Sequence, residues 1–337
     1  MKRIFVLAIA ALIAFGGVLG SARAQEMTKT IADIVVETAG GANPEFTTLL
    51  AAVQAADPAV LETLSNKDAQ LTVFAPTDAA FKAVEEALGA EAWAALLADP
   101  ARLTSILTFH VVPAAVKSTD VVAMLEEMEG AFSVQSAQGQ YIDVASSENG
   151  ITINGANLNL EMVDIEAVNG VIHVIDAVIL PETKTIAELV QEAATDTENP
   201  QFTTLLAAVA AADEAVLTTL ADTNAKLTVF APTDEAFSKV PAETLTALLA
   251  DKAGLTNVLL YHVIPTVAGS DAVTALLGEN TEVKVGTALT RDGAAVEATI
   301  KVMDGKLMID GANIVATNID AANGIIHVID AVILPPQ

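Results

Sequence analysis

The stretch LTVFAPTDAAF at residues 71–81 returns as LTVFAPTDEAF at 227–237, and NGVIHVIDAVILP at 169–181 returns as NGIIHVIDAVILP at 323–335. Matching residues lie about 155 positions apart throughout, so one unit is written twice with few insertions. A period of this length is too long for a solenoid repeat, which runs about 20 to 50 residues. A unit of about 150 residues buries roughly 70% of its unfolded surface and can form a core of its own. The chain therefore consists of two copies of one domain.

The first residues lie outside this repeat. Lys2 and Arg3 precede an apolar run at 4–19, which ends in the small-x-small pattern Ala22-Arg23-Ala24. The run is shorter than the roughly 20 residues that a membrane-spanning helix needs. We therefore expect a signal peptide that is cleaved after Ala24, and a secreted protein, extracellular or periplasmic, without a membrane span.

The repeat and the leader together predict the domain organisation. The expected parts are a signal peptide at 1–24, domain 1 at 25–181, a linker at 182–184 and domain 2 at 185–337. The chain has no cysteine, so core packing must stabilise an exported protein that cannot form disulfides.

The charge of the chain limits its partners. It has 43 acidic residues against 16 Lys and Arg, which gives a formal net charge of −27. Phosphate backbones and anionic lipid headgroups are bound through Lys and Arg, so we expect no nucleic-acid partner. The acidity of this apolar chain is best explained by solubility.

Each copy runs from helices to strands. Apolar residues at three- and four-residue steps over 46–53 and 202–209 predict amphipathic helices. The β-rich runs that follow, at 71–75 and 227–231, stop at Pro-Thr-Asp, where the threonine can cap the next helix and the aspartate favours its positive end.

The second half of each copy is strand-like. Hairpin turns are expected at Asn149-Gly150 and Asp304-Gly305. The run 171–180 is apolar on both faces, so we expect it at the centre of a covered sheet. Helices followed by a largely non-local sheet predict an α+β domain.

Three motifs occur in the same order in both copies: LTVFAPTD-x-AF, then (Phe/Tyr)-His-Val-(Val/Ile)-Pro, then NG-(Val/Ile)-IHVIDAVILP. Together they resemble the fasciclin I-type domain, over about 30–181 and 185–335. The resemblance implies two tandem fasciclin-like domains, each a β-wedge flanked by helices, in a secreted adhesion protein. It also implies a binding module without enzymatic activity, whose partners are cell-surface or matrix proteins or glycans.

All four histidines lie in these motifs, at His110, His173, His262 and His327. Strand alternation puts His173 and Asp176 on opposite faces, and likewise His327 and Asp330, so these residues do not form local catalytic or metal-binding pairs. We expect structural, hydrogen-bonded and buried histidines, neutral in the folded state, with no metal or cofactor.

The resemblance also points to candidate adhesion contacts. In animal matrix members of the family, integrin recognition has been tied to a Tyr-His motif and to an Asp-Ile dipeptide before the final strand. The first corresponds to Phe109-His110 and Tyr261-His262, so copy one has lost the hydroxyl. The second corresponds to Asp164-Ile165 and Asn318-Ile319, so copy two has lost the charge. Neither copy keeps both features, and the alternative is that the two aromatic residues belong to the core.

Other functions have less support in the sequence. It contains no Gly-x-Ser-x-Gly elbow, Gly-rich phosphate loop or His-Glu-x-x-His helix, so we expect no enzyme. Two alternatives to adhesion stay open: a soluble carrier of an apolar small molecule such as a carotenoid or lipid, framed by the Ala- and Leu-rich helices, and an envelope protein that binds another protein. Trp93 is either a core residue or part of such a pocket.

Overall fold

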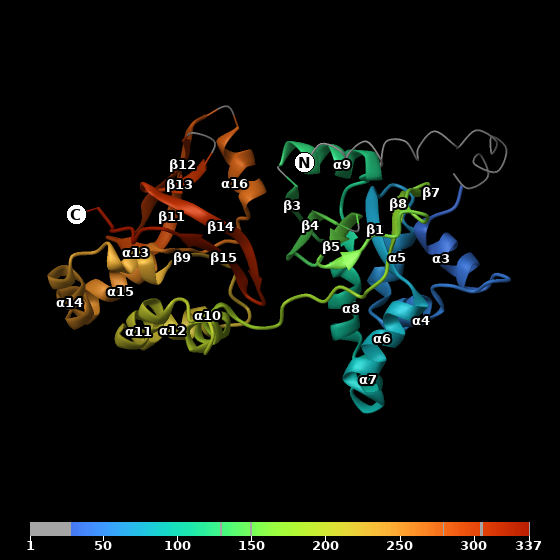
Figure 1. Cartoon of the computed structure of the whole chain (residues 1–337), viewed down its shortest axis with the longest axis horizontal. Helices are drawn as coiled ribbons and strands as arrows, with labels where there is room; N and C mark the ends of the chain where they lie inside the picture. Colours follow the sequence, from blue (N-terminus) through green and yellow to red (C-terminus); the bar gives the residue numbers. More distant parts are fainter. Residues whose placement is uncertain (1–27, 129, 149, 279, 304–305, 337) are drawn as a thin grey trace. The chain divides into compact units, whose positions relative to one another are not determined.

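The computed structural model describes residues 28–336 except 129, 149, 279 and 304–305, and the chain divides into two compact units between Leu180 and Pro181 (Figure 1). The expected signal peptide at 1–24 lies outside the described residues. No helix in the described part of the chain is long and apolar enough to cross a membrane.

Unit 1 combines helices with two sheets. Its helices are α3 (Ile31–Ala39), α4 (Thr47–Ala55), α5 (Pro58–Ser65), α6 (Asp78–Leu88), α7 (Ala90–Leu97), α8 (Pro100–Phe109) and α9 (Ser118–Glu127). Its strands are β1 (Leu71–Pro76), β2 (Val111–Val112), β3 (Ala131–Gln135), β4 (Tyr141–Ser147), β5 (Gly150–Ile153), β6 (Ala156–Asn157), β7 (Ile165–Ala167) and β8 (Gly170–Ile175).

Unit 2 repeats this order of elements. Its helices are α10 (Ile186–Thr195), α11 (Thr203–Ala211), α12 (Glu214–Ala221), α13 (Asp234–Ser238), α14 (Ala242–Ala250), α15 (Lys252–Tyr261) and α16 (Ser270–Leu277). Its strands are β9 (Leu227–Pro232), β10 (Val263–Ile264), β11 (Glu282–Arg291), β12 (Ala294–Met303), β13 (Lys306–Ile309), β14 (Ala312–Ala321) and β15 (Gly324–Ile329). The predicted α+β class is confirmed.

The threonines of the Pro-Thr-Asp motifs cap the helices that follow them, as predicted. The hydroxyl of Thr77 accepts a hydrogen bond from the Ala80 N–H at 3.1 Å, and Thr233 does the same for Ala236. The neighbouring Asp78 also caps a second helix. Its carboxylate accepts hydrogen bonds from the backbone N–H groups of Thr47 and Thr48 at the start of α4.

The two most similar motifs form the centre of each unit. In unit 1 the sheet order is β2-β1-β8-β7, and β1 and β8 run parallel with Phe74 beside His173. Every residue of both strands is buried. Side chains alternate between two hydrophobic clusters: Val73 belongs to the cluster with α3, α4, α5 and α8, and Phe74 to the cluster with α9 and the second sheet. A strand with a core on each face must be apolar on both faces, which explains the unbroken apolar run.

The prediction of a strand as far as Leu180 is wrong beyond Ile175. At that point Asp176 leaves the sheet and accepts hydrogen bonds from the backbone N–H and the side-chain amide of Asn157, at 2.7 and 2.8 Å. The chain continues to Ile179 without strand pairing.

The Asn-Gly pair before this strand connects distant parts of unit 1. The buried side chain of Asn169 accepts the Ile31 N–H and donates to the Leu64 carbonyl oxygen, both at 2.9 Å. Gly170 has a φ of 148°, and an added Cβ would lie 1.9 Å from the Leu71 carbonyl oxygen. Only glycine therefore allows β8 to lie against β1 at this point.

The two units differ in how their sheets continue. Unit 2 has one seven-stranded sheet, in the order β10-β9-β15-β14-β13-β12-β11, whereas unit 1 has two four-stranded sheets. Copy one has two more residues between Asn157 and Asp164 than copy two has between Asn313 and Asn318. The insertion divides the counterpart of β14 into β6 and β7.

Helices α9 and α16 interrupt the half of each copy that the sequence predicts as strands. Val121 and Leu125 lie one helical turn apart and are both buried in α9, a helical spacing that the strand prediction overlooked. The expected turn residues Asn149 and Asp304-Gly305 lie outside the described residues, while the flanking strands pair antiparallel, β4 with β5 and β12 with β13.

A candidate adhesion site at the turn before the final strand

Each unit has a left-handed kink in the segment that pairs with its final strand, named here the pre-strand turn: Asp164-Ile165 at the start of β7 in unit 1, and Asn318-Ile319 within β14 in unit 2, where the strand register shifts. Asp164 has a φ of 54° and Asn318 a φ of 58°. Asp and Asn tolerate this left-handed conformation better than other non-glycine residues. The two copies therefore keep one backbone shape despite the exchanged side chain.

The side chain of the first turn residue caps a helix. The carboxylate of Asp164 accepts a hydrogen bond from the Ser118 N–H at 2.8 Å and one from the Ser118 hydroxyl, at the start of α9. In unit 2 the Asn318 amide oxygen accepts the Ser270 N–H at 2.9 Å, and its amide nitrogen donates to the Ser270 hydroxyl. The exchange of Asp for Asn keeps the cap of α16 but removes a charge from it.

The backbone of the turn is bound to the histidine of the final strand. The Asp164 N–H donates to Nδ1 of His173 at 3.3 Å, and the Asn318 N–H donates to Nδ1 of His327 at 3.2 Å. The opposite ring nitrogen, Nε2, lies 2.9 Å from the carbonyl oxygen of Val116 or Ala268. An amide only donates and a carbonyl only accepts, so each ring is neutral with its proton on Nε2. Burial lowers the pKa of both histidines.

The other two histidines have the opposite tautomer. Nδ1 of His110 lies 2.8 Å from the Ile106 carbonyl oxygen, and Nε2 accepts the Ile179 N–H at 3.2 Å. His262 makes the same pair of bonds with Val258 and Ile333. Burial lowers the pKa of His110 and His262 to about 4, so both are neutral at neutral pH.

The aromatic residues before these histidines are buried too. Phe109 and Tyr261 are 1% and 2% exposed. The Tyr261 hydroxyl donates to the carboxylate of Asp310 at 2.6 Å, and burial together with this bond raises the Tyr261 pKa. Unit 1 has Phe109 and Asn154 at the two positions, so the aromatic residue and its polar neighbour have changed together.

The candidate contacts thus lie at different depths. Those with buried side chains are Phe109, His110, Tyr261, His262 and Asn318. Asp164 and Ile165 are half-buried, and Ile319 is 39% exposed. A direct role in adhesion stays a prediction for all eight, and of these positions Asp164, Ile165 and Ile319 offer the most surface.

The structure brings some predicted residues together and keeps others apart. Asp164 meets His173, whereas Asp176 and Asp330 turn away to bind Asn157 and Asn313. Sequence reasoning missed the partners Val116 and Ser118, which are 57 and 46 residues from theirs. A serine at the start of a helical repeat of apolar residues was the only local signal for them.

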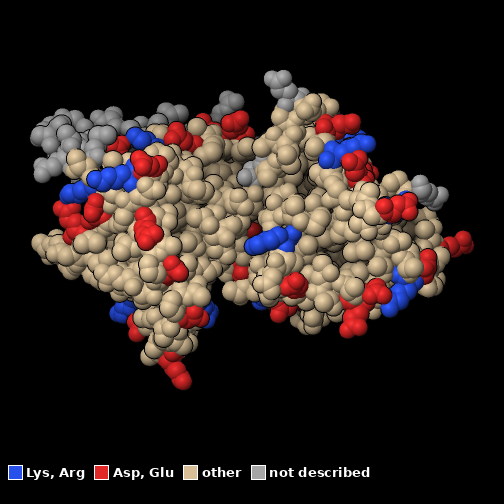
Figure 2. Space-filling model, turned by 180° about the vertical axis from the view of Figure 1, so that it is seen from behind, with Lys and Arg blue, Asp and Glu red and all other residues tan. Residues whose placement is uncertain are grey.

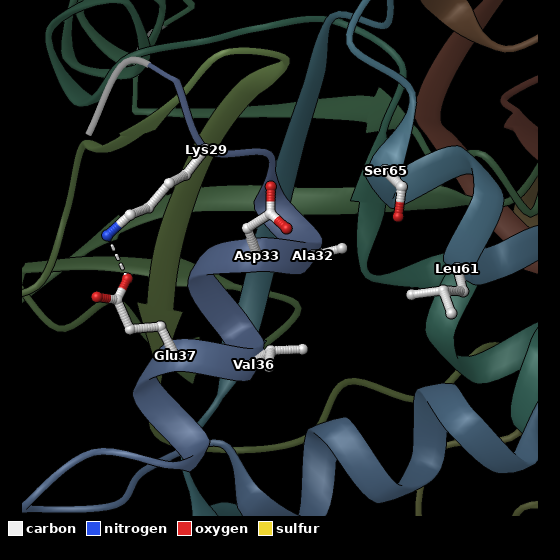
Figure 3. A pocket seen from close by; sticks show the side chains of 7 residues that line it. All are labelled: Lys29, Ala32, Asp33, Val36, Glu37, Leu61 and Ser65. Atoms are coloured by element: carbon white, nitrogen blue, oxygen red, sulfur yellow. Dashed lines mark hydrogen bonds and ion pairs between the residues drawn. The ribbon is translucent and has the colours of Figure 1, made fainter. Parts of the chain in front are cut away.

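Unit 1 also has an open hollow of about 500 Å³ between α3 and α5 (Figure 3). Val36 and Leu61 are 52% and 40% exposed there. The charged groups of its rim already have partners, since Lys29 pairs with Glu37 and Asp33 accepts from Thr30. Nothing in the hollow selects one class of ligand.

Two apolar cavities bear on the alternative of a carrier. One lies among helices of unit 2 and has a volume of about 30 Å³. The other lies beside Trp93 and Phe81 in unit 1 and has a volume of about 20 Å³. Ligand pockets usually measure about 300 to 1,000 Å³, so neither cavity holds a carotenoid or lipid unless the helices move.

The charged side chains do not form one binding patch on the visible face, where acidic groups are scattered among a few bases (Figure 2). The salt bridges of the described residues, such as Lys82 with Glu86 and Lys117 with Glu166, involve exposed or half-exposed side chains. Pairs of this kind contribute about 0 to 1 kcal/mol each. No cluster of metal-binding side chains is present among the described residues.

Comparison with known proteins gives a consistent result. A model of the fasciclin domain matches residues 44–181 and 200–335. The chain is similar to protein sll1483 of Synechocystis, with 38% identity over 46% of this chain and 84% of that protein. It is 32% identical to transforming growth factor-beta-induced protein ig-h3 of Sus scrofa, over 78% of this chain and 34% of that protein. Human periostin is 26% identical over 89% of this chain and 31% of its own length.

The chain thus spans about a third of the length of ig-h3 and of periostin. Among solved structures it is similar to a FAS1 domain pair from the insect cell adhesion molecule Fasciclin I. That pair shares 18% sequence identity, with a TM-score of 0.40 and coverage of 86% of this chain and 96% of the other.

Proposed function

The chain belongs to the fasciclin domain family, and from this premise we propose that it is a secreted protein that attaches cells to one another or to a surface. The observation that carries the proposal is the match of the fasciclin model to both halves of the chain. This family consists of adhesion-type domains and is not known for enzymes. Two linked binding modules raise avidity when their geometry lets both engage.

The pre-strand turns are the proposed contacts. Both copies keep a left-handed residue followed by isoleucine, at Asp164-Ile165 and Asn318-Ile319. The partner is a cell-surface or matrix protein or glycan. A chain with a net charge of −27 repels the phosphate backbone of nucleic acid.

Export is part of the same proposal. The leader at 1–24 is removed after Ala24, and domain 1 at 25–181 is joined to domain 2 at 185–337 by residues 182–184. Mass spectrometry of the protein recovered outside the cytoplasm should give a chain that begins at Gln25. A chain that keeps residues 1–24 would contradict the cleavage.

Attachment itself is tested with the host's own cells. A strain that lacks the gene should attach less to a surface and to other cells, and purified protein should restore attachment when it is added from outside. Unchanged attachment in the deletion strain would refute the adhesive role.

The contacts are tested with variants of the full chain. Ile165→Ala and Ile319→Ala should each weaken the restored attachment, and the double variant should weaken it most. Val168→Ala is a matched control, because Val168 is 37% exposed and lies three residues beyond Ile165. Equal restoration by the control and the turn variants would remove the turns from the binding surface.

A further inference from the structure

The pre-strand turn lies beside the final strand, where Ile165 pairs with Ile172 and Ile319 pairs with Ile326. Its first residue also donates a backbone hydrogen bond to a histidine side chain of that strand. The Asp164 N–H donates to Nδ1 of His173, and the Asn318 N–H donates to Nδ1 of His327. The same rings hold the segment before α9 or α16 through Nε2 and a carbonyl oxygen. Each ring therefore joins the turn, the final strand and the start of a helix.

A proton cannot be added to these rings without loss of a bond. The free lone pair of the ring is on Nδ1, so the proton binds there and turns the acceptor into a donor. The N–H of Asp164 or Asn318 then faces a second N–H, and the hydrogen bond to the turn is lost. Phe74 lies beside the ring of His173 and Phe230 beside that of His327, with ring centroids 6.0 and 5.4 Å apart. A charged imidazolium is therefore poorly solvated on that side, and its burial costs free energy that movement of the ring toward solvent would relieve.

The charged surroundings of the two rings differ. In unit 1 the Asp164 carboxylate acts on His173 and opposes the effect of burial on its pKa. The nearby Lys117 and Glu166 form an ion pair of their own at 2.8 Å. In unit 2 Asn318 replaces the carboxylate, and burial lowers the pKa of His327. The half-buried Asp320 of β14 stands at the position of Glu166.

We propose that His173 and His327 act as acid-sensitive latches, which means that protonation of each ring breaks its hydrogen bond to the backbone N–H of Asp164 or Asn318. On acidification this bond is lost in unit 1 before it is lost in unit 2. The latch holds at neutral pH, where both rings are neutral. Below the ordinary histidine pKa of about 6.5, the carboxylate of Asp164 stabilises the imidazolium of His173. In unit 2 the corresponding residue is Asn318, which has no charge to stabilise the imidazolium of His327. If the turns are the adhesion contacts of the proposed function, acidification also weakens attachment.

The first test is a pH titration of the full chain by NMR, which follows the ring nitrogens of the histidines and the backbone amides of Asp164 and Asn318. We expect His173 to take up its proton at a higher pH than His327, and the Asp164 amide signal to change together with His173. Trp93 fluorescence and circular dichroism, recorded on the same samples, show whether the units stay folded. The latch is refuted if the amide signals stay unchanged while the rings are protonated, or if a whole unit unfolds before its turn changes.

The two copies supply matched variants of each other. Asp164→Asn should remove the difference between the pH values at which His173 and His327 are protonated. Asn318→Asp should raise the pH at which His327 is protonated. Both substitutions keep an oxygen that caps the helix, so both proteins should fold. Unshifted titrations in both variants would overturn the proposed order of opening.

Glutamine provides an independent variant, because its oxygen can accept from the turn and its nitrogen can donate to the carbonyl group, without protonation in this range. His173→Gln combined with His327→Gln should make attachment insensitive to pH between about 7 and 5. Attachment that still falls with acid would refute the latch as its cause. Absence of attachment at pH 7 in the unaltered protein would refute the proposed function alone, because the NMR titration still decides the latch.

Discussion

Each histidine of the protein donates from one ring nitrogen and accepts at the other, and all four partners of the acceptor nitrogens are backbone N–H groups. His110 and His262 have folded pKa values of about 4 because they are buried. Their unfolded value is about 6.5, so the unfolded chain binds more protons between these limits. The stability they contribute is complete above pH 6.5 and is lost as the pH falls toward 4.

As the pH falls from about 6.5 to about 4, we expect protonation of His110 and of His262 each to lower the free energy of unfolding by about 3 kcal/mol. Hydrogen-bonded carboxylates such as Asp78 have lowered pKa values through bonds that outweigh burial, so their stabilisation is lost only below their ordinary value of 3.8. Urea denaturation at pH 7 and at about pH 4.5 separates the two effects. Equal free energies of unfolding at both pH values would contradict the account.

A second prediction concerns the buried hydroxyl of Tyr261. Tyr261→Phe removes the bond to Asp310 and should cost about 1.5 to 3 kcal/mol of unfolding free energy, as expected for a hydrogen bond to a charged group. Installing the pair in unit 1 tests the same contact in reverse, because Phe109→Tyr should be tolerated better with Asn154→Asp than without it. A double-mutant cycle measures this coupling, and a coupling near zero would show that the two positions are independent.

At the level of secondary-structure elements, the contact between β1 and β8 gives a sharper prediction. Gly170→Ala places a Cβ 1.9 Å from the Leu71 carbonyl oxygen, so unit 1 should lose more than about 4 kcal/mol or fail to fold. Trp93 lies in unit 1 with its ring centroid 6.3 Å from that of Phe81, and its fluorescence in urea reports this unit.

Gly89→Ala is the control for that substitution. Gly89 also has a positive φ, of 81°, but an added Cβ would meet nothing within 4 Å. The expected cost is about 1 to 3 kcal/mol, from the positive φ combined with a ψ of 155° alone. Similar losses for Gly89→Ala and Gly170→Ala would show that the approach of β1 and β8 is not the cause.

Local signals predicted most of these elements, and long-range contacts account for what they missed. The cap at Thr77 and the central covered strand follow from nearby residues. The end of β8 at Ile175 depends on Asn157, and the carboxylate of Asp78 caps a helix that begins 31 residues earlier. The role of Val116 as partner of His173 is equally non-local. The sequence contains these residues, but it does not predict which of them form hydrogen bonds with one another.

For the whole molecule, the duplication predicted the two units and their class, but not how their sheets differ. Two extra residues beyond Asn157 divide the sheet of unit 1. Neither the number nor the composition of these residues predicts that the sheet divides there. The family resemblance predicted adhesion contacts from motifs, and burial of Phe109 and Tyr261 shows that part of those motifs forms the core.

The net charge of −27 gives a prediction for the entire chain. Repulsion among its acids opposes the compact state, and the screening length falls from about 30 Å at 0.01 M salt to about 8 Å at 0.15 M. Potassium chloride should therefore raise the free energy of unfolding across this range at pH 7. Urea denaturation at both salt concentrations measures it, and a constant or falling free energy would contradict dominant self-repulsion.

The parallel pairing of Leu71 with Gly170, and of Leu227 with Gly324, also sets the timing of folding. The central strand of each unit receives its main partner from nearly the last segment of that unit to leave the ribosome. Non-local pairing of this kind slows folding to roughly milliseconds or longer, and domains generally fold one after another during synthesis. A nascent chain stopped before residue 170 thus exposes the apolar faces of β1, which makes it a substrate for chaperones until the closing strand arrives.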